Sequence, residues 1–431
     1  MIIFNFIYRL LDKLGAMLNI IILSPNYRSF GNCSEAIYFG LLHCMDRNKK
    51  MLIIKPFNKF FFKNISIANR SLYQLQHELI IKPSFLFNFL LSLLMTVLAG
   101  SCFLYIKFRI NFAKAFNLPK VMQIDSKELA ELATQKFGWN DIWEVSEEIS
   151  YIEKRWIDLE KKYVPPDLPE HVKKSSDQFI KQNIPEAINK KWVTLHSIDN
   201  TINDNARGAN IDEYFLAVEY LTSRGFHIFR IGDKRLPRCK ETKGLTDLAH
   251  LNHDNSLDLY LIQNAEFHFG VSSGPKWIGY LFNKDVFSTN IVDWSTDIPR
   301  KKGNFFIMKT FFTKSTNKKI PISMLLEHDF GFQINTNSIG DRDLYVKDNS
   351  GIEILEALKE FLQFKEGNKV YTAAQKKFDK KKNLWLKEEL GRTDLVVEHW
   401  PLSTYNLHRK RSFAMSTVSG TMSNSFLNEN W

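Results

Sequence analysis

The chain has 431 residues, of which 44% are hydrophobic and 24% charged, so its composition is that of a globular protein and excludes collagen, coiled coil and disorder. Its four cysteines are widely spaced, which fits neither a disulfide framework nor a zinc site and suits a reducing cytoplasm. Residues 1–120 hold 15 Lys and Arg against 4 Asp and Glu, so they account for the whole net charge of +11, and this segregation argues against a nucleic-acid partner.

The chain opens with the pattern of a parallel α/β unit. Residues 16–24 form an apolar run that ends before Pro25, and they predict a buried strand. Residues 34–48 predict a helix, and residues 51–55 predict a second strand. A strand, a glycine-containing turn, a helix and another strand are typical of the start of a Rossmann-like domain. We expect this domain to span residues 1–163.

An uncharged apolar segment at residues 85–106 lies inside the basic part of the chain. Lys82 precedes it, and Lys107 and Arg109 follow it. About 20 apolar residues can cross a bilayer as a helix. A buried helical hairpin and an interfacial segment on an anionic leaflet fit the same sequence. We expect a cytoplasmic protein that meets an anionic membrane surface, bound peripherally at the inner face of the cell membrane.

A second α/β domain follows a proline-rich linker. Residues 164–169 cannot be helical, and with the next helix they connect the domains up to residue 190. A doubly wound parallel sheet is predicted over residues 191–364, because strands and helices alternate there. The strands are expected at 192–196, 226–231, 267–271 and 285–289, and the helices at 212–224, 256–264, 274–282 and 352–364. Residues 365–431 predict a helical extension and a loose tail.

The loop after the strand at 267–271 has the composition of a phosphate site. In open α/β sheets, ligands bind beyond the carboxyl ends of the strands. Here the chain reads Ser272-Ser273-Gly274 and then enters a helix, which gathers hydroxyls and unpaired amide N–H groups at a positive helix end. This pattern predicts an anion site. A serine that only caps the helix is the ordinary alternative.

Two other loops and one helix supply further candidate groups for a diphosphate donor. Arg207, after the strand at 192–196, can bind two phosphate oxygens at once, and Lys276 is a second candidate cation. Gly232 and Asp233 follow the strand at 226–231, and the Asp233 carboxylate can accept hydrogen bonds from ribose or sugar hydroxyls. A solvated surface arginine and a common Gly-Asp turn are the alternatives.

Three side chains are candidates for a general base that removes a proton from an acceptor hydroxyl: Glu35, Asp199 and His196. A histidine at the end of a strand often serves structure alone, so the role of His196 is open. The sequence has no metal-binding His/Cys spacing and none of the glycine motifs of ATPases or NAD enzymes. We therefore expect no resident metal or cofactor.

Residues 192–290 resemble a family of bacterial glycosyltransferases encoded among surface-polysaccharide genes, and more distantly the heptosyltransferases and fucosyltransferases. The matching segments are WVTLHSIDN (192–200), NARGANIDEYFLAVEYLTSRGFHIFRIGD (205–233), LDLYLIQNAEFHFGVSSGP (257–275) and Thr289-Asn290. The segment SFGNCSEAIYF (29–39) resembles the acceptor-side loop and helix of the same family. This resemblance makes Arg28, Gly31 and Asn32 the acceptor-side candidates.

The resemblance implies an α/β protein of the GT-B type, with two Rossmann-like domains facing across a cleft. The implied reaction moves a sugar from a nucleotide-diphosphate donor to a glycan or lipid-linked acceptor in surface-polysaccharide synthesis. One position departs from the family pattern. Related sequences read His-x-Arg-Asp where this chain has Ile198 in place of the arginine. Either Arg207 replaces that arginine, or the protein is a catalytically inactive binder of sugar nucleotides or polysaccharide.

Overall fold

The chain divides into two compact units, one made of residues 1–169 and 396–407 and the other of residues 170–395 and 408–431. Each unit has its own parallel sheet and is described by itself. The computed structural model of the protein describes residues 15, 17–23, 29–55, 67–93, 159, 161–199, 206–292, 298–299, 301, 303–326, 339, 343–368, 370–391 and 420–431. The α/β class predicted from the sequence is confirmed. The expectation that two halves face each other across a cleft stays a prediction.

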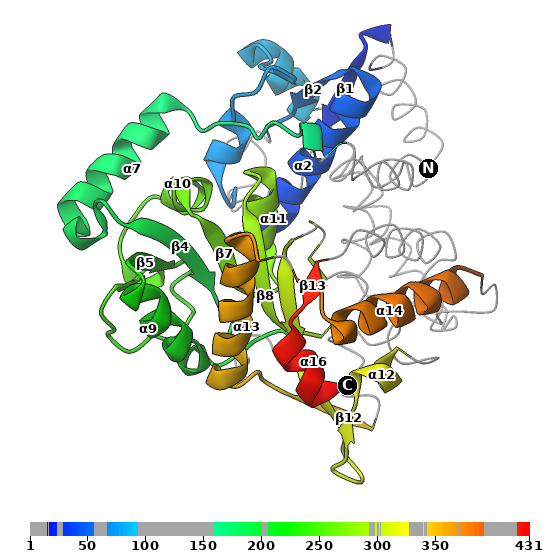
Figure 1. The fold of residues 1–431 in the computed structure, drawn as a ribbon. Coiled ribbons are helices and arrows are strands. Elements are labelled where there is room, and N and C mark those ends of the chain that lie inside the picture. Colours follow the sequence, from blue (N-terminus) through cyan, green and yellow to red (C-terminus); the bar gives the residue numbers. More distant parts are fainter. Residues whose placement is uncertain are drawn as a thin grey trace, which may run out of the picture. The chain divides into compact units, whose positions relative to one another are not determined.

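The first unit contains the predicted strand–helix–strand opening. Strands β1 (Ile20–Leu23), β2 (Lys50–Ile53) and β3 (Ile80–Ile81) are parallel and lie in that order (Figure 1). Helix α2 (Phe30–Arg47) connects the first two strands, and a 3-10 turn, η1 (Arg70–Gln74), precedes the third. The Ser29 hydroxyl accepts a hydrogen bond at the start of α2, and Asn48 ends the helix in a left-handed conformation.

The apolar segment begins with a helix that covers this small sheet. Residues 85–93 are helical, and Leu91 packs with Leu52 and Ile54. The opposite side of the helix is open, because Phe85 is 78% exposed and Leu86 64%. Within the described residues, no helix is both long and apolar enough to cross a membrane. The rest of the segment, residues 94–106, lies outside the described residues.

The second unit is built on a seven-stranded parallel sheet whose spatial order is β13–β9–β8–β7–β4–β5–β6 (Figure 1). In chain order the strands are β4 (Lys191–His196), β5 (Phe226–Arg230), β6 (Leu245–Asp247), β7 (Phe267–Val271), β8 (Asp285–Ile291), β9 (Phe305–Met308) and β13 (Thr421–Met422). All four predicted strands are present. The order is that of a doubly wound Rossmann-type sheet, in which the chain adds strands first on one side of β4 and then on the other.

Helices cover both faces of this sheet, as right-handed crossovers between parallel strands require (Figure 1). On one face, η5 (Ile211–Tyr214), α9 (Phe215–Ser223) and α13 (Gly351–Lys365) pack together. The other face carries α10 (Ser256–Asn264) and α11 (Gly274–Leu281), and α7 (Glu170–Asn183) packs on α10. Asn210 caps η5, because its side chain accepts a hydrogen bond from the Asp212 amide. Short 3-10 turns η4 (Pro185–Ala187) and η6 (Leu248–His250) complete the connections.

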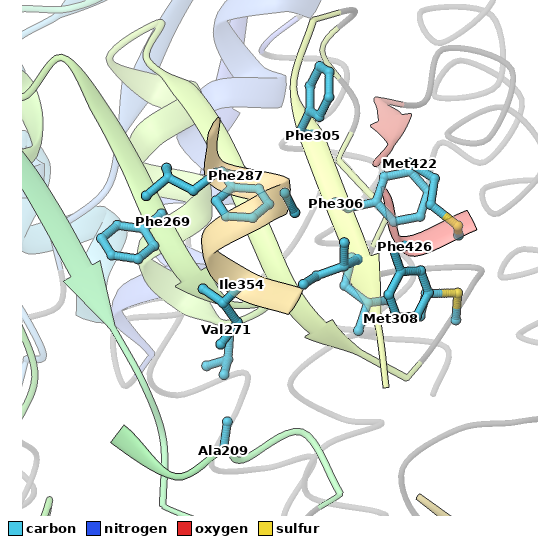
Figure 2. Packing of buried hydrophobic residues seen from close by; sticks show 14 of the residues in the cluster. Ala209, Phe269, Val271, Phe287, Phe305, Phe306, Met308, Ile354, Met422 and Phe426 are labelled. Atoms are coloured by element: carbon cyan, nitrogen blue, oxygen red, sulfur yellow. The ribbon is translucent and has the colours of Figure 1, made fainter. Parts of the chain in front are cut away.

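The core of the second unit is dominated by phenylalanine. Phe269 and Phe287 on neighbouring strands stack with nearly parallel rings (Figure 2). Phe361 of α13 packs over Phe267 and Phe287. Each of these rings is almost fully buried. A fully buried side chain of this size contributes about 2 kcal/mol or more through the hydrophobic effect. These packed rings hold the strands in place, and the strands carry the loops at the carboxyl edge of the sheet.

The end of the chain belongs to the folded unit, which differs from the loose tail that the sequence predicted. After α14 (Ala373–Gly391), strand β13 pairs parallel to β9, and α16 (Asn424–Asn430) buries Phe426 and Leu427 in the core (Figure 2). Glu360 of α13 accepts hydrogen bonds from the Asn424 amide and thereby caps α16. A small antiparallel sheet of β11 (Lys319–Ile320), β10 (Thr310–Thr313) and β12 (Leu344–Lys347), with α12 (Ile322–Leu325), completes the unit.

Candidate functional site at the carboxyl edge of the large sheet

The carboxyl ends of β4 and β7 define the switch point of the large sheet. These strands are neighbours, yet the chain leaves β4 towards β5 and leaves β7 towards β8, on the other side. Loops that diverge in this way leave the edge of a doubly wound sheet open, and ligands bind there. Of the candidate residues in this unit, the structure brings His196, Ser272 and Ser273 to the ends of these two strands.

The start of α11 carries a buried cation and an unused hydroxyl. The Lys276 side chain is buried and donates a hydrogen bond to the Ser272 Oγ at 2.7 Å. Ser273 is the N-cap residue of α11, but its hydroxyl makes no capping bond. Although Ser273 is only 8% exposed, its Oγ has no hydrogen-bond partner in the described part of the chain. A buried polar group without a partner is costly, so this hydroxyl is suited to an incoming ligand.

His196 is a neutral imidazole with a fixed tautomer. Its Nδ1 lies 2.9 Å from the Ile231 carbonyl oxygen, which can only accept, so Nδ1 carries the hydrogen. Nε2 is therefore left with a lone pair. Burial lowers the pKa of His196 below its ordinary value, and the positive charge of the nearby Arg230 acts in the same direction. An unprotonated imidazole nitrogen at this edge can accept a proton or a hydrogen bond from a substrate hydroxyl.

Gly232 allows the chain to pass close to this imidazole. Its φ of +153° is strained for other residues, and an added Cβ would lie 2.3 Å from Leu236 Cδ1 and 3.7 Å from His196 Cε1. The next residue, Asp233, was expected to meet sugar hydroxyls. Its carboxylate accepts hydrogen bonds from the Arg235 side chain, which is the main cause of the lowered pKa of Asp233, and the role toward sugar hydroxyls stays a prediction. A substrate hydroxyl that donates a hydrogen bond to Asp233 would therefore bind a carboxylate that Arg235 also contacts.

Ile198, which stands where the resembling sequences have an arginine, is partly buried. Ile198 packs against the hydrophobic cluster of the large sheet, and its carbonyl oxygen accepts a hydrogen bond from the Ala209 amide at 2.7 Å. The Ser197 hydroxyl donates to the Ala209 carbonyl at 2.8 Å. These bonds hold Ala209 next to the two residues that follow β4, so Arg207, two positions earlier, also lies near the carboxyl end of that strand. Asp199, directly after Ile198, is half-buried.

The acceptor-side candidates lie in the first unit, at the start of α2. Gly31 is buried, Asn32 is exposed, and the Asn32 amide donates to the Ser29 hydroxyl that caps the helix. Glu35 follows one turn later and is buried. Arg28 lies outside the described residues. The structure therefore groups Gly31, Asn32 and Glu35 on one helix, separately from the residues of the large sheet.

Two charged pairs at the same edge of the large sheet were missed by the sequence reasoning. Arg230, at the end of β5, is 1% exposed and pairs with Asp247 at the end of β6, at 2.9 Å. Lys309, directly after β9, is equally buried and pairs with Asp348 at 2.6 Å. A charged residue inside or at the end of a fully apolar strand, as in FHIFR or FFIMK, is the signal that could have identified both.

No group of His, Cys, Asp and Glu side chains in the described ranges is arranged to hold a metal ion. No protein-family model matches the chain, and no curated protein matches it in sequence. Among solved structures, it is similar to the E. coli ADP-heptose lipopolysaccharide heptosyltransferase II, with 10% identity, a TM-score of 0.37, and coverage of 81% of this chain and 100% of the other.

A second similarity is to the iron-containing dodecameric heptosyltransferase TibC in complex with ADP-D-β-D-heptose. Identity is 18%, the TM-score is 0.20, and the match covers 25% of this chain and 28% of that chain. TibC from enterotoxigenic E. coli H10407 matches to a similar degree, over 30% of its length. Likenesses this weak assign the chain to no family. The residues of the site itself therefore indicate the function.

Proposed function

We propose that the protein is a glycosyltransferase that moves a sugar from a nucleotide-diphosphate donor to a glycan or lipid-linked acceptor in bacterial surface-polysaccharide synthesis. The observation that carries the proposal is the unpartnered, buried hydroxyl of Ser273, which lies beside Lys276 at the start of α11. This hydroxyl stands at the switch point of a doubly wound sheet, where such folds bind nucleotides. Serine hydroxyls, helix-end amides and a cation together match the chemistry of a phosphate.

In this proposal the carboxyl edge of the large sheet holds the donor. Ser272, Ser273, Gly274 and Lys276 bind one phosphate, and Arg207 approaches the diphosphate from the loop after β4. Charge develops on the diphosphate as it leaves the sugar, and fixed hydrogen-bond donors stabilise it without reorganisation. Gly232 gives the donor room beside His196, and the carboxylate of Asp233 accepts hydrogen bonds from ribose or sugar hydroxyls.

Proton removal from the acceptor is assigned to one of three groups. His196 has the best support, because it is neutral and its Nε2 lone pair remains after Nδ1 bonds to Ile231. Asp199 in the adjacent loop and Glu35 on α2 are the other candidates. We assign the acceptor to the first unit, through Arg28, Gly31, Asn32 and the neighbouring helix.

An anionic membrane surface is the proposed partner of the first unit. Phe85, Leu86 and Leu90 are 78%, 64% and 52% exposed on one helix, and the exposed Lys82 precedes it. Apolar side chains next to cations are typical of a helix that lies in the interface of an anionic leaflet. Such docking would bring the protein to a lipid-linked acceptor.

A second candidate function is a catalytically inactive protein that binds sugar nucleotides or polysaccharide. The observation in its favour is Ile198, which replaces the arginine of related sequences and packs into the core. If Arg207 does not supply the missing charge, the leaving diphosphate would be poorly stabilised. The fold would then still bind a donor without transferring its sugar.

Release of nucleoside diphosphate from a panel of sugar nucleotides, with and without lipid-linked acceptors, tests the proposal. We expect the purified wild-type chain to release the diphosphate from one donor, and Ser273→Ala and Arg207→Ala to release it more slowly. Donor binding without release by any donor–acceptor pair would favour the inactive binder. Absence of binding to every member of the panel would contradict both.

A further inference from the structure

A buried lysine and an aspartate hold the loop that carries Arg207. The Lys309 side chain is 1% exposed, and its Nζ donates to the Gly208 carbonyl oxygen at 2.5 Å and to Asp348 Oδ1 at 2.6 Å. Asp348 Oδ2 accepts a hydrogen bond from the Asn210 amide at 3.1 Å. One ion pair therefore contacts the main chain on both sides of Ala209.

Ala209, in the middle of residues 208–210, is also held by the two residues that follow β4. The Ala209 amide donates to the Ile198 carbonyl, and the Ala209 carbonyl accepts from the Ser197 hydroxyl. Residues 208–210 are thus fixed by groups from β4, from the end of β9 and from the segment after β12. Arg207 directly precedes them, so the starting point of its side chain is set by these contacts.

The arrangement is unfavourable for a purely structural contact. Removing the Lys309 ammonium from water is costly, and replacing a buried ion pair by apolar side chains of similar size is often neutral or stabilising. Burial lowers the pKa of Lys309, and the hydrogen bond to Asp348 opposes that effect. Unlike apolar side chains, the ion pair makes directional hydrogen bonds, and these fix the positions of the Gly208 carbonyl and the Asn210 amide.

We infer that Lys309 and Asp348 are positioning residues that hold residues 206–210 where Arg207 meets an anionic ligand. This inference rests on the proposed function, in which that ligand is the diphosphate of a sugar nucleotide. Neither residue touches the ligand. Misplacement of a binding group by about 1 Å can reduce its effect as much as 100-fold, so loss of the pair should weaken binding of a diphosphate.

The first measurement needs no ligand. Hydrogen exchange of the Ala209 and Asn210 amides in the full chain is compared between Lys309→Met and Lys365→Met. Lys365 is a matched control, because its Nζ also donates to a main-chain carbonyl, that of Glu266, and to a carboxylate, Asp285, at the opposite edge of the same sheet. We expect both amides to exchange at least tenfold faster than wild type in Lys309→Met only. Equal exchange in the two variants overturns the inference.

The second measurement tests whether Lys309 affects ligand affinity through Arg207. Affinity for inorganic pyrophosphate and for nucleoside diphosphates is measured in wild type, Lys309→Met, Arg207→Ala and the double variant. We expect Lys309→Met to weaken binding about tenfold or more, and to have little further effect once Arg207 is alanine. An undiminished effect in the Arg207→Ala background overturns the inference, because Lys309 would then act elsewhere.

Two further outcomes are distinguishable. If the wild type binds none of these probes, the proposed function fails, while hydrogen exchange still decides whether Lys309 holds the loop. If exchange is faster but pyrophosphate affinity is unchanged in Lys309→Met, the inference fails and the proposed function stands. Should Lys309→Met not fold, Asp348→Asn keeps the shape of the carboxylate and removes its charge. We expect the same two effects in that variant, smaller in size.

Discussion

Gly270, the residue before the last of β7, lies against the main chain of His196 at the end of β4. With a φ of +134°, it has a conformation that other residues rarely adopt, and an added Cβ would lie 1.9 Å from the His196 carbonyl oxygen. The two residues are paired in the parallel register of the sheet. The candidate general base is thus held at the switch point by a strand that approaches closely because Gly270 lacks a side chain.

Gly270→Ala should therefore destabilise the second unit strongly. We expect a loss of about 3 kcal/mol or more in the free energy of unfolding, because a left-handed φ and a main-chain clash add together. Urea unfolding followed by circular dichroism measures it. Gly225→Ala is the control, since Gly225 has φ +84° but no atom within 4 Å of the added Cβ, and it should lose only about 1 kcal/mol. Equal losses would contradict the close contact with His196.

Ser273→Ala should weaken ligand binding without weakening the fold. The Ser273 hydroxyl makes no bond in the described structure, so its removal leaves the free energy of unfolding unchanged or raises it by about 1 kcal/mol. Affinity for a nucleoside diphosphate, measured by calorimetry, should fall about tenfold, which corresponds to roughly 1.4 kcal/mol. Ser272→Ala is the comparison, because it removes the acceptor of the Lys276 bond and should lower stability as well. A stability loss in Ser273→Ala would indicate a structural role.

Arg230→Met should destabilise the large sheet by about 3 kcal/mol, because it removes the cation that pairs with the partly buried carboxylate of Asp247 and leaves only the Cys239 amide and thiol donating to it. The double variant Arg230→Met/Asp247→Leu removes both charges and should recover most of that loss. Chemical unfolding of the full chain measures both. Lys174→Met, which removes the exposed partner of Glu170, should change stability by less than about 1 kcal/mol. No recovery in the double variant would show that packing, not charge pairing, determines the effect.

Stability should fall when the solution becomes acidic, because buried histidines resist protonation. Burial lowers the pKa of His268 to about 3 and that of His227 to about 4, and it lowers the pKa of His196 as well. Below about pH 6.5 these histidines are protonated in the unfolded chain but not in the folded chain. The free energy of unfolding therefore falls as the pH drops towards the pKa values of the histidines in the folded protein. Above that pH these groups contribute no pH dependence.

The expected slope is about 1.4 kcal/mol per pH unit for each of His268 and His227 between pH 6 and 5. Urea unfolding at several pH values measures it. His268→Asn should remove one proton's share of the slope, whereas His171→Gln, at an exposed position on α7, should leave it unchanged. A wild-type stability that does not change between pH 7 and 5 would contradict the burial of these imidazoles.

Phe85→Ser/Leu86→Ser should weaken membrane binding. Each exposed apolar side chain that enters the interface contributes about 1.5–3 kcal/mol, so loss of both should reduce vesicle binding more than about tenfold. Flotation with phosphatidylcholine vesicles, with and without an anionic lipid, measures it, and the wild type should bind the anionic vesicles more tightly. Ile352→Ser removes an equally exposed apolar residue of the second unit and serves as the control. Failure of the wild type to bind anionic vesicles would overturn the membrane proposal.

The sequence by itself determined the order of strands and helices in the large sheet. Hydrophobic periodicity and the glycine-containing turns are local signals, and they placed β4, β5, β7 and β8 within a few residues of their observed ends. Parallel strands with crossover helices share one carboxyl edge, so the loops with Ser273, Gly232 and Arg207 could be assigned to one edge before any coordinates were known.

Only the tertiary structure decided which side chains at that edge are buried, hydrogen-bonded or paired with a charge. Lys309 and Gly208 are separated by 101 positions, and no local pattern relates them. The two-residue strand β13 is too short for any periodic signal and forms only because β9 offers an unpaired edge. The burial of Ile198, the pairing of Asp233 with Arg235 and the unpartnered Ser273 hydroxyl likewise depend on neighbours. Propensity and pattern act along the chain, whereas burial and charge pairing are decided by what folds against each residue.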